Sequence, residues 1–256
     1  MSIKISYSNN IEDKSKNNYA FFVDENFNIN TIKKNFSDTE ISYIQEILKK
    51  TKIFFLSSFD LNTKKKIILI NVKKNLESSE VENLGAEFYN FIKNNNIEEL
   101  SINSDSLNIK TEKNFIGYFI LGLKLKSYEF NIYKSKKKNR IFTISILGKK
   151  NNLTLKNELR FKAIEEGTNF ARDLVSEPPN VLNPKEYVNR LLKLRNLGIK
   201  VTTYNESQLK KLGMHSLLGV GRGSINESFL VTLEWIGNKK NKKAPLSFVG
   251  KGVCFD

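Results

Sequence analysis

The sequence has few of the residues on which several kinds of site depend. Its 256 residues include one cysteine, Cys254, and one histidine, His215. A single cysteine excludes an intrachain disulfide and favours a reducing compartment. A single histidine excludes a histidine-based zinc site or a catalytic triad within this chain, and it gives Cys254 no activating partner. We therefore expect His215 to be an ordinary loop residue and Cys254 to be a buried, inert thiol.

Long apolar runs are also missing. No stretch of eighteen or more apolar residues occurs, and residues 1–7 lack the apolar core of a secretory signal. We therefore expect a cytoplasmic protein without a membrane span. Hydrophobic residues make up 39% of the chain, which is typical of a globular protein and is enough for one large or two modest domains.

The formal net charge of +15 raises the alternative of nucleic-acid binding. The lysines, however, are scattered along the whole chain beside many asparagines and isoleucines, as a biased codon usage would produce. We interpret the charge mainly as a solvated surface, and phosphate binding stays open as the less favoured reading.

The first part of the chain alternates between strand and helix patterns. Short β-branched and aromatic runs predict strands at 19–23, 53–57, 67–72 and 140–147. Apolar residues at helical spacing predict helices near 41–48, with Asp38 as a cap, near 81–92 and near 115–123. Strands interleaved with helices predict an N-terminal α/β domain over 1–152.

A polar break at 149–152 predicts the domain boundary. A long helix over 153–175 follows, with Leu159, Ala163, Ile164, Phe170 and Leu174 on its apolar side, and connects to a second α/β domain at 176–256.

The second domain begins with a strong helix start. Asn183 is the expected cap, Pro184 stands at the first helical position and Glu186 is placed to reach back. Strands are expected at 199–204 and 229–236, with a short helix at 206–212 between them and Trp235 in the core.

The last twelve residues hold the most informative pattern. Residues 246–249 have the length and bulk of a buried strand, and Gly250 and Gly252 would let the backbone turn and approach a ligand. Lys251 lies between these glycines and Asp256 follows. Polar groups just past the carboxyl end of a parallel strand are where open α/β sheets place their sites. From the residue types alone, this pair fits either a salt bridge or a metal site.

The glycines at 219, 221 and 223 allow a phosphate-loop reading. The dinucleotide pattern, however, requires G-x-G-x-x-G directly after a strand, and Lys251 lacks the flanking residues of a Walker motif. We interpret these glycines as tight backbone turns.

Three stretches carry a resemblance to a known family. They are 169–184 (Asn-Phe-Ala-Arg-Asp-Leu-Val-Ser-Glu-Pro-Pro-Asn-Val-Leu-Asn-Pro), 212–224 (Leu-Gly-Met-His-Ser-Leu-Leu-Gly-Val-Gly-Arg-Gly-Ser) and 249–256 (Val-Gly-Lys-Gly-Val-Cys-Phe-Asp), with weaker likeness at 128–135. In order and spacing they resemble the leucine aminopeptidases, also called cytosol aminopeptidases. The resemblance covers most of 115–256.

The resemblance implies a metal-dependent aminopeptidase that releases N-terminal residues from peptides. It implies that Lys251 and Asp256 are ligands of a site for two divalent ions, manganese or zinc. It also implies a macro-domain-like N-terminal domain, a mixed sheet flanked by helices, followed by the first part of the α/β metallopeptidase catalytic domain. Family members form homohexamers.

The family's catalytic lysine and arginine, and its later carboxylate ligands, match no position of this sequence. We therefore expect no catalytic residue here, an incomplete catalytic domain, and no peptidase activity from this chain alone. Some family members bind DNA, so a non-catalytic DNA-binding or co-assembling module is the alternative.

Overall fold

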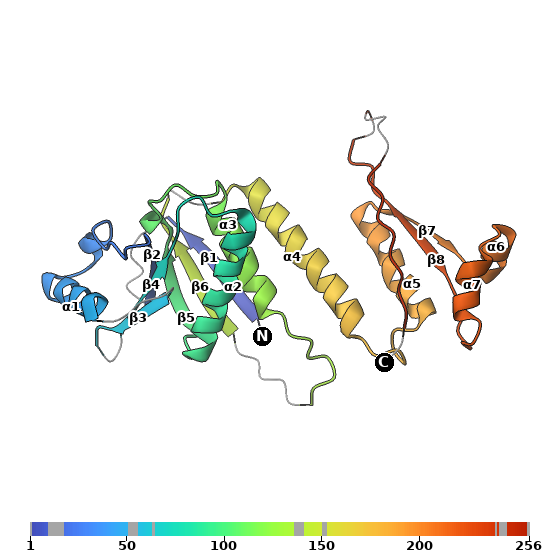
Figure 1. Ribbon diagram of the computed structural model, residues 1–256, viewed down its shortest axis with the longest axis horizontal. Coiled ribbons are helices and arrows are strands. Elements are labelled where there is room, and N and C mark those ends of the chain that lie inside the picture. Colours follow the sequence, from blue (N-terminus) through green and yellow to red (C-terminus); the bar gives the residue numbers. More distant parts are fainter. Residues whose placement is uncertain are drawn as a thin grey trace. The chain divides into compact units, whose positions relative to one another are not determined.

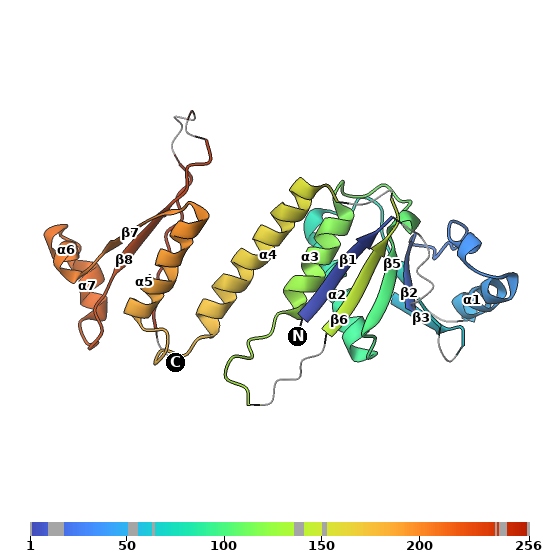
Figure 2. The same ribbon diagram turned by 180° about the vertical axis from the view of Figure 1, so that it is seen from behind.

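The computed structural model describes residues 2–9, 18–50, 56–62, 65–135, 141–149, 153–238, 240 and 245–254. The chain folds as two compact units, Met1–Phe170 and Ala171–Asp256. Figures 1 and 2 trace both units from opposite sides, and each is described here by itself.

A six-stranded sheet forms the centre of the first unit. Its strand order is β1-β6-β5-β2-β4-β3, and every neighbouring pair is parallel except β3 with β4. The strands are β1 (Ser2–Ser8), β2 (Asn18–Val23), β3 (Leu56–Asp60), β4 (Lys66–Asn71), β5 (Glu99–Asn103) and β6 (Ile141–Leu147). Parallel strands need crossover connections, and the helices supply them.

Helices cover both faces of this sheet. They are α1 (Asp38–Lys50), α2 (Ser78–Asn94) and α3 (Phe115–Ser127), with short 3-10 turns at Lys33–Asn35 and Ser104–Ser106. Helix α4 (Leu155–Ser176) follows and packs against α3 through Phe161. Side chains of β4 alternate between two cores: Ile68 and Ile70 face the core with α2 and α3, whereas Ile67 and Leu69 face the core with α1. Such near-continuous apolar strands are typical of a sheet buried on both sides.

Helices α2 and α3 approach each other closely, and they lie side by side in Figures 1 and 2. A Cβ atom on Gly85 of α2 would lie 1.9 Å from the backbone oxygen of Phe119. A Cβ atom on Gly122 of α3 would lie 1.8 Å from the backbone oxygen of Glu82. Each helix therefore uses a glycine where the other helix's backbone passes, and no side chain fits at either place.

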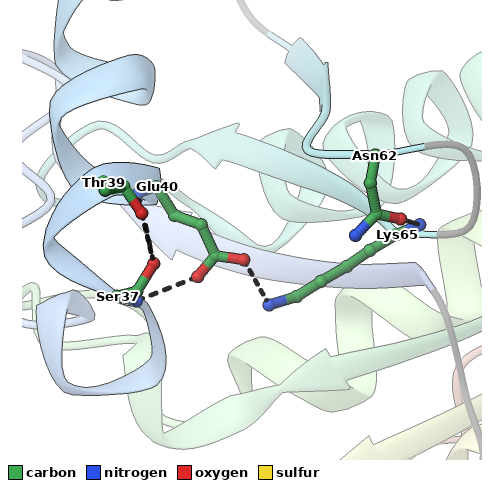
Figure 3. Close-up of polar contacts among 5 residues, drawn as sticks. All are labelled: Ser37, Thr39, Glu40, Asn62 and Lys65. Carbon is green, nitrogen blue, oxygen red and sulfur yellow. Dashed lines mark hydrogen bonds and ion pairs between the residues drawn. The ribbon is translucent and has the colours of Figure 1, made fainter.

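The start of α1 is fixed by a reciprocal cap, shown in Figure 3. The Ser37 amide donates to Oε2 of Glu40 at 2.9 Å, and the Glu40 amide donates to Oγ of Ser37 at 3.3 Å. The other carboxylate oxygen of Glu40 accepts from Nζ of Lys65 at 2.8 Å. The prediction of Asp38 as the cap was wrong by one residue, because Asp38 is already the first helical residue.

The predicted α/β fold is confirmed, and so are the strands around 19–23, 67–72 and 140–147. Of the strand predicted at 53–57, residues 53–55 lie outside the described residues, and 56–57 begin β3. Strands β1 and β5 were missed. Both are short and half polar, although Ile3 with Ile5, and Leu100 with Ile102, keep a period of two.

The long helix predicted at 153–175 is α4, but its apolar side was wrong. Leu159 is 59% exposed and Ile164 is 38% exposed, whereas Phe161 is buried. The Phe161 ring packs edge-on against Tyr118, with centroids 5.0 Å apart, and occupies the space where a Cβ of Gly117 would lie. Because Gly117 has no side chain, the Phe161 ring can pack against α3 at this position, and this determines which face of α4 is buried.

The second unit is small. It contains α5 (Pro184–Leu192), β7 (Lys200–Tyr204), α6 (Glu206–Lys211), α7 (His215–Gly221) and β8 (Leu230–Glu234), with a 3-10 turn at Lys193–Leu197. Strands β7 and β8 pair antiparallel as a two-stranded sheet. Its buried apolar residues are Leu182, Val188, Leu191, Val201 and Leu209.

The predicted start of α5 is confirmed in part. Oδ1 of Asn183 accepts from the Glu186 amide at 3.0 Å, and Pro184 occupies the first helical turn. The Glu186 carboxylate, expected to reach back to Asn183, instead accepts from Asn189 and Arg190 further along the helix. Gly213 ends the α6 region with a left-handed φ of 71°, as glycine allows.

Two other predictions for this unit were wrong. Trp235 is 74% exposed, because β8 ends at Glu234 and no described element covers the ring. His215 is the first residue of α7 and not a loop residue. None of the helices in the described part of the chain has both the length and the apolar character needed to cross a membrane.

Candidate functional site

Residues 245–254, which include the expected ligand Lys251, form an extended segment without a turn. The prediction of a buried strand at 246–249 was wrong: Leu246, Phe248 and Val249 are 83%, 88% and 100% exposed. A strand needs a neighbouring strand to satisfy its backbone groups. In this unit, the pairing found among the described residues joins β7 only to β8.

The glycine turn predicted around Lys251 was also wrong. Neither Gly250 nor Gly252 takes a left-handed φ in the structure, so this part of the backbone needs no glycine for its conformation. Lys251 itself is exposed, and it forms no ion pair with any carboxylate among the described residues. Asp256, the second expected ligand, lies outside the described residues.

The described residues do not by themselves enclose a metal ion. Among them, no group of three or more His, Cys, Asp or Glu side chains lies close enough together to hold one. A catalytic zinc normally takes three protein ligands and a water. Lys251 can offer one amine nitrogen, so most of a two-ion ligand set has to come from elsewhere.

The terminal segment passes near Tyr187 at Gly252. A Cβ atom on Gly252 would lie 3.6 Å from Cε1 of Tyr187, which is ordinary van der Waals contact, whereas one on Gly250 would meet nothing within 4 Å. Tyr187 lies in α5 and is half-buried. Helix α5 and the terminal segment run side by side in Figures 1 and 2.

An ion-pair network holds α5 against the turn that precedes it. Nη1 of Arg190 donates to Oε1 of Glu177 at 2.9 Å, and Nε of Arg190 donates to Oε1 of Glu186 at 3.2 Å. The Glu177 side chain is only 4% exposed. Partial burial disfavours the charge of Arg190, but hydrogen bonds to both glutamates outweigh that effect and raise its pKa.

The Glu186 carboxylate is stabilised in its charged form. Hydrogen bonds from Asn189 and then from Arg190 hold the pKa of Glu186 below its usual value. Sequence reasoning missed this network, because Glu177 and Arg190 are separated by the turn and most of α5. The helix start at Asn183 was the available hint that the two would be brought together.

The structure also places the glycines at 219, 221 and 223. Gly219 and Gly221 lie within α7, and Gly223 follows it, so these glycines form no phosphate-binding loop directly after a strand. The expected tight turns are therefore not found at Gly219 and Gly221.

Cys254 is half-buried, and burial raises its thiol pKa. The expected burial is therefore only partial, and the expected inertness stays a prediction that a raised pKa favours, because the neutral thiol is a poor nucleophile.

Comparisons with known proteins connect this terminal region to a family. Residues 169–256 match the family model described as cytosol aminopeptidase family, catalytic domain. The chain is related to the cytosol aminopeptidases. Probable cytosol aminopeptidases of Phytoplasma australiense and Phytoplasma mali are 39% and 40% identical over 164 and 159 residues, 63% and 60% of this chain. One from Caulobacter vibrioides is 34% identical over 197 residues, 75% of this chain.

Solved structures show the same fold. A tomato leucine aminopeptidase mutant matches with a TM-score of 0.70 and 17% identity, covering 90% of this chain and 50% of that chain. The bottromycin maturation enzyme BotP in complex with Mn matches with a TM-score of 0.60 and 16% identity, covering 85% of this chain and 44% of that chain. The matched region spans about a third of the two phytoplasma relatives, 33% and 32% of their length.

Proposed function

We propose that this chain carries part of the active site of a metal-dependent aminopeptidase that removes N-terminal residues from peptides. The family match over residues 169–256 carries the proposal, since it includes both Lys251 and Asp256. The exposed position of Lys251 is compatible with this role, because no described carboxylate already occupies its amine.

Lys251 and Asp256 are proposed as two of the ligands of a pair of divalent ions. An uncharged amine and a carboxylate are suitable donors for zinc or manganese, and the BotP structure contains Mn. When bound, such ions activate a water and polarise the peptide carbonyl. Lys251 has to lose its proton in order to ligate, and neighbouring dications favour that loss.

The remaining ligands and the catalytic groups are proposed to come from the part of the catalytic domain that relatives have and this sequence does not match. Exposed apolar residues of the second unit support this proposal. Phe248 and Val249, just before Lys251, and Leu233 on β8 are exposed to 88%, 100% and 49%. Large apolar side chains as exposed as these gain free energy when a further part of the domain covers them. Assembly into a homo-oligomer, a hexamer as in the family, belongs to the same proposal.

The test uses two proteins and one substrate. The first protein is the 256-residue chain. The second is a chimera in which residues 169–256 replace the matching region of the Phytoplasma australiense relative. Both are assayed on leucine p-nitroanilide with manganese. We expect turnover from the chimera and none from the chain alone; an inactive chimera that folds as well as the relative would contradict the proposal.

A further inference from the structure

We propose that helix α4 contains a hinge at residues 167–169, where the helix opens locally and lets the second unit turn independently of the first. Helix α4 runs over Leu155–Ser176, and the first unit ends at Phe170, so the hinge lies just before the boundary between the units. In the proposed function the second unit joins the remaining part of a catalytic domain, and a hinge lets it do so without moving the first unit. Only this use rests on the proposed function, since the hinge itself is a property of the helix.

The sequence of α4 has its lowest helix propensity at this place. Gly167, Thr168 and Asn169 follow one another, and all three are poor helix formers. Glycine loses the most backbone entropy in a helix, threonine is restricted by its branched side chain, and asparagine competes for backbone hydrogen bonds. The flanking residues, 155–166 and 171–174, are mostly leucine, lysine, glutamate, arginine and alanine, which favour a helix. The helix therefore opens more readily at 167–169 than on either side.

Packing gives no reason for a glycine at position 167. Gly85 and Gly122 are needed because the backbone of a neighbouring helix passes within 2 Å of the place where a Cβ atom would lie. A Cβ atom on Gly167 would meet nothing within 4 Å in the described part of the chain, so an alanine would fit there. An alanine would favour the closed helix about fivefold. The effect of Gly167 on this structure is therefore a weaker helix.

A side chain at the same place also disfavours the closed helix. Oδ1 of Asn169 is buried and finds no hydrogen-bond donor among the residues that the structure describes. A buried carbonyl oxygen without a donor favours any state in which water reaches it. Local opening at 167–169 provides such a state. This cause is independent of backbone propensity, and both causes act on the same turn of the helix.

The part of α4 before the hinge is held firmly by α3. The Phe161 ring packs edge-on against Tyr118, with centroids 5.0 Å apart, and Oε2 of Glu165 accepts from Nζ of Lys124 at 2.8 Å. These contacts fix the helix up to Glu165. Bending is therefore expected after this residue, where the poor helix formers lie.

Hydrogen exchange of single amides, measured by NMR on the 256-residue chain, tests the hinge. Amides 170–172 donate to the carbonyls of 166–168, so their exchange reports opening of the proposed hinge. We expect them to exchange at least about ten times faster than amides 162–165, and also faster than amides 174–176, which lie nearer the helix end. A steady rise in exchange toward Ser176 would show simple fraying of a helix end and would overturn the inference.

Stabilising variants test the two causes separately. Gly167→Ala with Thr168→Ala should slow the exchange of amides 170–172 about tenfold, because alanine is the best helix former. Asn169→Leu, which removes the buried oxygen but keeps a similar shape, should slow it about fivefold. Lys162→Ala, at an exposed position of the same helix, is the control and should leave these amides within about twofold of the unchanged chain. Exchange in the double variant equal to that in Lys162→Ala would overturn the inference.

Residual dipolar couplings test whether the second unit turns independently. The amide couplings of each unit are fitted separately to an alignment tensor, with no metal and no substrate present. We expect the two tensors to differ in magnitude in the unchanged chain and to approach each other in the double variant. A single tensor for both units of the unchanged chain would show that α4 is a rigid connection and would overturn the inference. An inactive chimera would contradict the proposed function but would leave these couplings unaffected.

Discussion

Arg190 and Glu177 form an ion pair in the second unit, with 2.9 Å between Nη1 and Oε1 and only 4% of the Glu177 side chain exposed. The pair joins the turn that precedes α5 to the helix itself. Removing one partner of such a pair leaves a buried charge uncompensated, which costs more than the pair itself contributes.

We therefore expect Arg190→Met to destabilise the second unit by about 3 kcal/mol, and Arg190→Lys by roughly half as much, because lysine cannot reach both glutamates in fork geometry. Hydrogen exchange of the α5 amides, followed by mass spectrometry, measures the loss of stability at this helix. Lys211→Met, a change at an exposed lysine of α6, is the matched control. Exchange in Arg190→Met equal to that in Lys211→Met would contradict the role of the pair.

The close approach of α2 and α3 gives a second prediction. Gly85→Ala and Gly122→Ala each place a methyl group within 2 Å of a backbone oxygen, at 1.9 Å and 1.8 Å. Each should lower the free energy of unfolding by about 3 kcal/mol or more, since backbone cannot move aside as a flexible side chain can. Gly167→Ala in α4 is the control: its Cβ meets nothing within 4 Å, and it should stabilise by about 1 kcal/mol. Urea denaturation followed by circular dichroism gives the free energy of unfolding of the three variants. Equal changes in all three would contradict the packing argument.

The Glu40 contacts predict a pH dependence. Partial burial tends to raise the pKa of Glu40, but hydrogen bonds from Lys65 and Ser37 outweigh it, so the folded-state pKa lies below the usual 4.5. A lowered pKa stabilises the folded state above about pH 4.5, and that stability is lost as the pH falls through the folded-state pKa. Glu40→Gln should therefore cost about 1 kcal/mol at pH 7 and much less at pH 3. Urea titrations at the two pH values test this, and a pH-independent difference would exclude it.

The raised pKa of Cys254 predicts slow alkylation. Burial favours the neutral thiol, so the folded chain should react with iodoacetamide only at a pH above that needed by the same chain in urea. The chain has one cysteine, so the measured alkylation rate belongs to Cys254. Identical pH midpoints for the folded and unfolded chain would show that the thiol is not protected.

Much of the first unit could be predicted from its sequence. Strand β4 and its neighbour β2 are buried on both faces, so nearly every residue is apolar and the pattern is visible. Strand β1 is a sheet edge, and only its inner side, with Ile3 and Ile5, contacts the core, which weakens the pattern. The buried face of α4 depended on Gly117, a residue of another helix, and no periodicity within α4 could show it.

The candidate site was less predictable for a physical reason. The run at 246–249 has the composition of a core strand, but composition cannot show whether a neighbouring strand is available, and the described residues provide none. The role of Lys251 came from motif resemblance. The ion pair of Arg190 with Glu177 joins residues thirteen positions apart, which no local pattern predicts.

Whether Lys251 serves as a metal ligand is the central question, and one measurement answers it most directly. In the chimera that carries residues 169–256, leucine p-nitroanilide hydrolysis with manganese is compared for Lys251→Met and for the control Lys211→Met. We expect Lys251→Met to lose at least about 100-fold in kcat/KM, as for loss of a ligand, and Lys211→Met to match the unchanged chimera. Full activity in Lys251→Met would contradict the account.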